Sequence, residues 1–260
     1  MEIVASKDGT PIAFERSGTG PALVLVHGTT ADHTRWTPLL PEFGKRFTVY
    51  AMDRRGRGES GDSDAYSLER EYEDVAAVAK AAGQGTSLLG HSYGALCVLE
   101  AALLTENVSK LILYEPAFPT EGQDLYPPGA LERFQALLDQ GDREVLLTTF
   151  FRELVGMSDD EISLVRAEPS WQGRLAAAHT AVRELADGDY VFEPDRFRKL
   201  EIPTLLLVGG SSPPFLRRPS ELVAAALPNS RIAEMPGQGH AAMTTAPELF
   251  LREVIGFLTG

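Results

Sequence analysis

Short apolar runs, each bounded by glycine, proline or polar residues, alternate along the chain with longer stretches of helical periodicity. Continuous runs such as Ala22–Val26 are typical of strands buried on both faces of a parallel sheet. The pattern predicts strands at Ala22–Val26, Phe47–Met52, Ser87–Leu89, Lys110–Tyr114, Thr204–Val208 and Arg231–Met235. Because strands and helices alternate, we expect an α/β fold with a mostly parallel central sheet and helices on both faces.

The first residues of the chain have a different pattern. Glu2–Ser6 and Ile12–Arg16 flank an Asp-Gly turn signal and predict a β-hairpin. Helical periodicity then predicts helices at Thr34–Phe43, Ser67–Ala82, Ala95–Leu104, Pro219–Leu227 and Pro247–Leu258. Ser67 is the expected N-cap of its helix.

Residues 118–197 interrupt the alternation, because they contain helical periodicity and no strand run. The expected helices are Leu131–Leu138, Arg143–Leu154, Asp159–Arg166 and Trp171–Leu185. A helical insert between two strands is typical of a cap over the sheet. We therefore expect a core domain of residues 1–117 and 198–260, and a cap domain of residues 118–197 inserted after the strand that ends at Glu115. The alternative is an embellishment that only covers apolar surface; we favour a lid that also shapes a pocket.

Composition and charge limit the kinds of partner that the protein can bind, but they do not indicate a reaction. The chain has 260 residues, 43% apolar and 23% charged, so it can bury a sizeable core. Its formal net charge of −13 argues against a nucleic-acid surface and against docking on an anionic membrane. Met1–Gly20 has no apolar signal segment, and no stretch approaches the length of a membrane span. We expect a cytoplasmic protein whose partner is a small-molecule substrate, and we leave a homodimer open.

The sequence predicts neither a disulfide nor a bound metal or cofactor. Cys97 is the single cysteine, and its apolar neighbours indicate a buried structural thiol rather than a nucleophile. Spacings typical of metal ligands, such as H-E-x-x-H or paired cysteines, do not occur. Gly56 and Gly58 follow a strand but open no helix at the spacing of a dinucleotide fingerprint.

The stretch Gly90-His91-Ser92-Tyr93-Gly94 carries the clearest chemical signal. It lies between an expected strand and an expected helix and reads G-x-S-x-G, the nucleophile-elbow pattern. Side chains at Gly90 or Gly94 would collide with the neighbouring strand or helix. The turn would hold the Ser92 hydroxyl at a helix N-terminus, where developing negative charge is stabilised.

Other polar residues also directly follow expected strands, and they should meet Ser92 at one edge of the sheet. They are His27–Thr29, Glu115, Ser211–Ser212 and His240. A serine hydroxyl needs an adjacent base to act as a nucleophile. Of the five histidines, His27 and His91 lie in tight turns and should bond to backbone, while His33 and His179 lie on a loop and on the cap. His240, in a glycine-rich loop after the last strand, is therefore the expected general base.

Together these motifs resemble the α/β-hydrolase superfamily, in its serine-nucleophile form with a helical cap. The resemblance rests on His27-Gly28, on the turn Asp53–Ser60, on the Ser92 elbow and on Gly237-Gln238-Gly239-His240. It implies an oxyanion hole made of two backbone N–H groups, those of Thr29 and Tyr93. It specifies the fold far better than the substrate.

One position departs from the family pattern. Relatives commonly carry an aspartate in the loop after the strand Thr204–Val208, but this loop, Gly209–Pro214, has no carboxylate. Glu115, the first residue past another strand, is the candidate for the acid that orients His240, and some relatives resemble this arrangement. Alternatives are a solvated or arginine-paired role for Glu115, with Glu121 or Asp124 as distant candidates for the acid.

From these residues we expect a serine hydrolase that cleaves a carboxylic ester, thioester or lactone of a small, apolar molecule through an acyl-enzyme on Ser92. The alternatives are a cofactor-free lyase, cyclase or C–C bond hydrolase using Ser92 and His240, and a small-molecule receptor. Arg54, Arg55 and Arg57 could bind an anionic substrate, but we favour structural ion pairs. Candidate pocket residues on the cap are Phe118, Tyr126, Phe134, Phe150, Phe151, Leu154, Trp171 and His179.

Overall fold

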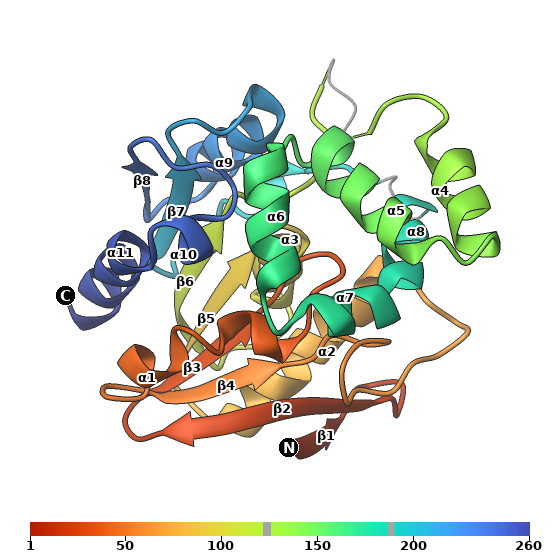
Figure 1. Cartoon of the computed structure of the whole chain (residues 1–260). Helices are drawn as coiled ribbons and strands as arrows, with labels where there is room; N and C mark the ends of the chain where they lie inside the picture. Colours follow the sequence, from red (N-terminus) through yellow and green to blue (C-terminus); the bar gives the residue numbers. More distant parts are fainter. Residues whose placement is uncertain (122–125, 187–189) are drawn as a thin grey trace.

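The computed structural model describes residues 1–121, 126–186 and 190–260, and these ranges form an eight-stranded sheet covered by helices (Figure 1). The strands are β1 (Glu2–Ala5), β2 (Pro11–Gly18), β3 (Ala22–Val26), β4 (Thr48–Met52), β5 (Thr86–His91), β6 (Val108–Tyr114), β7 (Thr204–Gly209) and β8 (Ser230–Met235). Their order in the sheet is β1-β2-β4-β3-β5-β6-β7-β8. β2 pairs antiparallel with β1 and with β4, and all other pairs are parallel. The predicted mostly parallel sheet is confirmed.

Helices of the sheet region lie on both faces. They are η1 (His33–Trp36), α1 (Leu40–Phe43), α2 (Leu68–Ala82), α3 (Tyr93–Ala101), η3 (Pro194–Arg196), α9 (Pro214–Ala226), α10 (Ala242–Thr245) and α11 (Pro247–Thr259). Helices α2, α3 and α9 share one buried cluster with the sheet, and α1 and α11 share another. In the described ranges no helix combines the length and apolar character needed to cross a membrane.

Alternation along β3 shows why its sequence is continuously apolar. Val24 and Val26 belong to the buried cluster on the α2 and α3 face, while Leu23 and Leu25 belong to the cluster on the α1 and α11 face. All four side chains are fully buried. Successive strand residues point to opposite faces, so a strand covered on both sides needs apolar residues throughout.

The segment between β6 and β7 is helical, as predicted, and lies over the edge of the sheet where the parallel strands end (Figure 1). Its helices are α4 (Ala130–Asp139), α5 (Arg143–Thr149), the π-helix η2 (Phe150–Leu154), α6 (Asp159–Ala167), α7 (Trp171–Ala176) and α8 (Ala178–Ala186). These helices pack around an apolar cluster of their own, to which Ala241 of the sheet region also belongs. This buried cluster therefore stabilises the arrangement of the cap helices above the sheet edge.

Several predicted helices differ in their bounds, and three of them illustrate the differences. The stretch Thr34–Phe43 forms two short helices, because Pro38 has no N–H to continue the ladder and Thr37 N bonds to Thr34 O instead. The stretch Trp171–Leu185 is divided at Ala177, whose backbone leaves the helical region at φ −88° and ψ 7°. Helix α9 begins at Pro214, five residues earlier than predicted, with Pro219 inside it.

Candidate active site

Ser92 lies at the sharp turn between β5 and α3. Its backbone has φ 57° and ψ −126°, a conformation that residues other than glycine rarely adopt. A Cβ on Gly90 would lie 2.5 Å from Ala95 Cα, and one on Gly94 would lie 2.6 Å from Val26 O. The predicted collision of a side chain at Gly90 or Gly94 with the neighbouring strand or helix is therefore confirmed.

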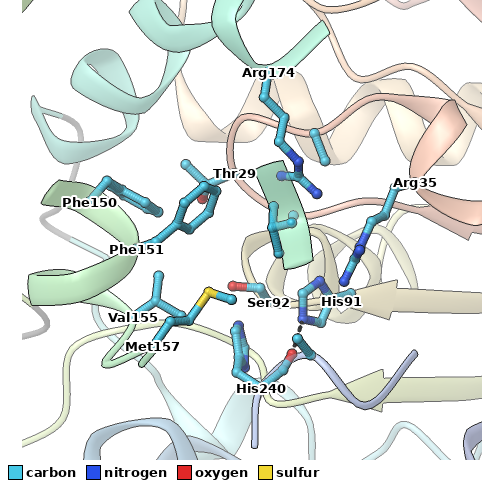
Figure 2. Close-up of a pocket in the computed structure, with 14 residues that line it drawn as sticks. Thr29, Arg35, His91, Ser92, Phe150, Phe151, Val155, Met157, Arg174 and His240 are labelled. Carbon is cyan, nitrogen blue, oxygen red and sulfur yellow. Dashed lines mark hydrogen bonds between the residues drawn. The ribbon is translucent and has the colours of Figure 1, made fainter. Parts of the chain in front are cut away.

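His240 lies in the loop after β8 and lines the same pocket as Ser92. Figure 2 shows its ring directed toward the Ser92 side chain. The backbone carbonyl of His240 lies 2.8 Å from His91 Nε2. A carbonyl can only accept, so His91 Nε2 carries a proton, and burial lowers the pKa of His91 well below its ordinary value. A neutral His91 thus anchors the loop that presents His240.

Glu115 is completely buried behind His240. Its Oε2 lies 2.5 Å from His240 Nδ1, and its Oε1 accepts a hydrogen bond from Gly209 N at 2.7 Å. The backbone of Glu115 has φ 45°, another strained conformation for a residue with a side chain. With Nδ1–H donating to this carboxylate, the Nε2 of a neutral His240 is an acceptor on the opposite side of the ring.

The strand order accounts for the reach of Glu115. β6 lies between β5, which ends at the Ser92 turn, and β7, which ends at Gly209. The carboxylate at the end of β6 therefore reaches Gly209 at the end of β7 and His240 in the loop after β8. Ser212, in the loop after β7, is buried, and its hydroxyl has no hydrogen-bond partner among the described residues. Of the distant alternatives, Glu121 is at an exposed turn, and Asp124 lies outside the described residues.

The loop after β3 brings Thr29 to the pocket. Gly28 approaches Ser92 so closely that a Cβ on it would lie 3.0 Å from Ser92 Cβ. Tyr93 is the first residue of α3, so its backbone N–H stands at a helix N-terminus next to Ser92. Its side chain turns into the core, where the Arg54 guanidinium lies 4.7 Å from the ring centroid. The geometry is compatible with the expected oxyanion donors.

The pocket above Ser92 is small, with a volume of about 40 Å³. It is lined by Gly28, Thr29, Ala31, Arg35, His91, Ser92, Phe150, Phe151, Val155, Met157, Val165, Arg174, His240 and Ala241 (Figure 2). Of the cap residues proposed from the sequence, Phe150 and Phe151 belong to this wall. The others pack in buried clusters or, like His179, bond locally to backbone.

Sequence reasoning missed Arg35 and Arg174 as pocket residues. Arg35 lies in the segment that we predicted as one helix. Arg174 lies on α7 beside Leu175 and Ala176. A single arginine next to apolar residues was the available signal. The same pattern occurs where an arginine lies at the solvent-facing edge of a helix, so it could not select these two.

The cluster Arg54, Arg55 and Arg57 is structural, as favoured. Arg54 Nη2 lies 2.9 Å from Glu71 Oε1, and Arg57 pairs with the same carboxylate at 3.1 Å. Burial raises the pKa of Glu71, but the two arginines outweigh it and lower the pKa to about 2. Arg55 pairs with Asp74 at 2.7 Å. His27 bonds to backbone at Gly28 O and Arg54 N, also as predicted.

Among the described residues, ligand spacing suitable for a metal ion occurs at Asp32, His33 and Asp53. Hydrogen bonds already occupy these atoms. Asp53 Oδ1 accepts from His33 N at 2.7 Å and lies 2.8 Å from His33 Nδ1, and its Oδ2 accepts from Glu59 N at 2.9 Å. Asp32 Oδ1 accepts from Thr34 N at 2.9 Å. The cluster holds the turn after β4 against η1.

Comparison with known proteins agrees with this fold and site. The model of the alpha/beta hydrolase family matches residues 23–253. A solved alpha/beta hydrolase from Sphaerobacter thermophilus is 38% identical, with a TM-score of 0.84 over 99% of this chain and 100% of the other. The chain therefore belongs to the alpha/beta hydrolase family.

Two named relatives are hydrolases. The 2-(acetamidomethylene)succinate hydrolase of Mesorhizobium japonicum is 26% identical over 93% of this chain and 89% of its own. The pimeloyl-(acyl-carrier protein) methyl ester esterase of Aeromonas hydrophila is 27% identical over 96% of this chain and 99% of its own. Fold, site and relatives together make this protein a hydrolase of the α/β-hydrolase fold.

Proposed function

We propose that this protein is a serine hydrolase that cleaves a carboxylic ester, thioester or lactone through an acyl-enzyme on Ser92. The observation that carries the proposal is the placement of His240. Its Nδ1 is held by Glu115 at 2.5 Å, and its ring is directed toward Ser92 in the pocket. A serine, a histidine and a buried carboxylate in this relation form the triad that activates a hydroxyl.

In the proposed reaction, Ser92 Oγ attacks the carbonyl carbon while His240 Nε2 takes its proton. Glu115 keeps His240 in the required tautomer and stabilises the imidazolium that forms. The backbone N–H groups of Thr29 and Tyr93 bind the oxyanion, each donor contributing about 2.7–4 kcal/mol to lowering the barrier. His240 then protonates the leaving alcohol. Water next attacks the acyl-enzyme while His240 takes its proton, and His240 returns this proton to Ser92 Oγ as the free acid leaves.

A second candidate reaction is cleavage of an amide. It is supported by the name of one relative, a hydrolase of an acetamido compound. The same nucleophile, base and oxyanion donors serve both bonds, and His240 would protonate the leaving nitrogen. The ester remains the first proposal because an alcohol leaves more readily than an amine.

The test is turnover of short-chain p-nitrophenyl esters by the full chain. We expect release of p-nitrophenol and of the free acid, and its loss in Ser92→Ala and His240→Ala. Ser212→Ala is the matched control, because it deletes a buried hydroxyl that makes no hydrogen bond within the described residues. Folded wild-type protein that turns over no ester, or turnover that persists in Ser92→Ala, would contradict the proposal.

A further inference from the structure

Arg174 is a buried arginine whose guanidinium enters the pocket that holds Ser92. It is 4% exposed, and Figure 2 shows its side chain extending from α7 into the space between Phe151 and Arg35. Its guanidinium lies 5.7 Å from the Phe151 ring centroid. Burying a charge in such a wall is costly unless polar groups compensate it.

The partners of Arg174 leave much of its guanidinium unused. Nη1 donates to Thr30 Oγ1 at 3.4 Å, a long hydrogen bond, and Nη2 lies 4.0 Å from Glu168 Oε2. Nε is buried and has no partner among the described residues. A guanidinium has five N–H donors, so Arg174 retains capacity to bind a ligand in the pocket.

Arg35, the other arginine of the pocket, has closer acceptors than Arg174. Its Nη1 donates to Glu168 Oε1 and to Thr244 Oγ1, each at 2.7 Å. Glu168 accepts further hydrogen bonds from Thr244 and Ser170. Glu168 therefore forms its close ion pair with Arg35. It balances the charge of Arg174 only from 4.0 Å.

The charge of Arg174 is incompletely balanced as a result. Burial and then the repulsion of Arg35 lower the pKa of Arg174 to about 10, against the opposing effect of Glu168 and Asp32. The Asp32 carboxylate is itself held by Thr34 N at 2.9 Å. At neutral pH the cation persists, and an anion in the pocket would supply the compensation that the protein does not.

Thr30 connects Arg174 to the loop beside the nucleophile. It is a buried β-branched residue at φ 63°, a conformation that persists only where the surroundings enforce it. Because Thr30 directly follows Thr29, one loop touches both Arg174 and the site of the expected oxyanion. A small molecule can therefore contact Arg174 while its carbonyl group lies at Ser92.

We propose that Arg174 binds a carboxylate of the substrate, which is then a half-ester of a short dicarboxylic acid. This specificity rests on the proposed hydrolase function. A carboxylate is planar and accepts two parallel hydrogen bonds from a guanidinium fork. Arg174 and Ser92 line the same pocket, so a short acid can reach both. Ser92 attacks the esterified carboxyl group, the alcohol leaves, and water releases the free dicarboxylic acid.

The test compares two esters of matched shape, monoethyl succinate and ethyl 4-methylpentanoate, in which an isopropyl group replaces the carboxylate. We expect kcat/KM to favour the half-ester by about 30-fold or more, as for one buried, hydrogen-bonded ion pair. Arg174→Gln should abolish this preference, because it should lower kcat/KM on the half-ester far more than on the neutral ester. Arg166→Gln, a matched change of an exposed arginine on α6, should keep the preference.

Binding separates this proposal from the hydrolase proposal. Calorimetric titration of Ser92→Ala with monoethyl succinate should show affinity about 30-fold higher than for the neutral ester, and the added change Arg174→Gln should remove the difference. A binding preference without turnover of either ester would sustain the carboxylate site and contradict the hydrolase. Equal turnover or equal binding of the two esters would overturn the carboxylate site. Arg174→Lys keeps the charge but lacks the guanidinium fork, so it should retain only part of the preference. This variant replaces Arg174→Gln in the test where the latter does not fold.

Discussion

Glu115 Oε2 lies 2.5 Å from His240 Nδ1, although the two residues are 125 positions apart and follow non-adjacent strands. β7 lies between β6 and β8, and its last residue, Gly209, donates its N–H to the other oxygen of Glu115. Both carboxylate oxygens are thus engaged. The glutamate side chain is longer than that of aspartate, and from the end of β6 it reaches a histidine that follows a strand two positions away in the sheet.

This relation predicts that the carboxylate of Glu115 supports catalysis. Glu115→Gln should lower kcat on an ester by about 10³–10⁴-fold, because an amide no longer favours the required tautomer and charge of His240. Ser212→Ala, in the loop after β7, should leave kcat unchanged. Steady-state kinetics on variants with native circular dichroism decide the matter. Comparable effects of the two substitutions would remove Glu115 from the triad.

The tight packing of the turn at Ser92 leads us to expect opposite effects of two glycine-to-alanine changes on stability. Gly94→Ala places a Cβ 2.6 Å from Val26 O and should lower the free energy of unfolding by about 1–3 kcal/mol. Gly256→Ala, in α11, meets no atom within 4 Å and should raise it by up to about 1 kcal/mol. Urea denaturation measures both, and equal effects would show that the turn is not tightly packed.

The ion pairs of Glu184 join the cap to the sheet region, and we expect them to contribute strongly to stability. This fully buried residue of α8 lies with its Oε1 2.6 Å from Arg54 Nη2 and also pairs with Arg57. Removing one partner of a buried ion pair typically costs about 3–5 kcal/mol, and we expect that loss for Glu184→Gln. Glu144→Gln breaks an exposed pair with Arg166 and should cost at most about 1 kcal/mol. Similar unfolding free energies for the two variants would contradict this view.

His33 predicts a pH-dependent contribution to stability. Its hydrogen bond to Asp53 raises its pKa above the ordinary value of 6.5, against the effect of burial. A raised pKa means that the charged pair stabilises the fold fully below the unfolded value and loses this effect as pH rises through the folded value. His33→Gln should therefore be more destabilising at pH 5.5 than at pH 9. A difference independent of pH would exclude the charged pair.

The sequence was sufficient for the central strands β3 to β7, because these strands are largely buried on both faces and hence mostly apolar. It was less informative where single residues interrupt a helix, as at Pro38 and Ala177. The position of Glu115 could be anticipated, since residues that follow parallel strands share one edge of the sheet. The position of Arg174 could not, because helical spacing does not reveal which face of a cap helix meets the pocket.

The most direct test of the central claim is covalent labelling of Ser92. A fluorophosphonate reacts with a serine hydroxyl only when a base activates it, and mass spectrometry of the digested protein locates the adduct. We predict one adduct on Ser92 in the wild-type protein, and strongly reduced labelling in His240→Ala and Glu115→Gln. Folded protein that carries no adduct on Ser92, or labelling unaffected by either substitution, would contradict the account.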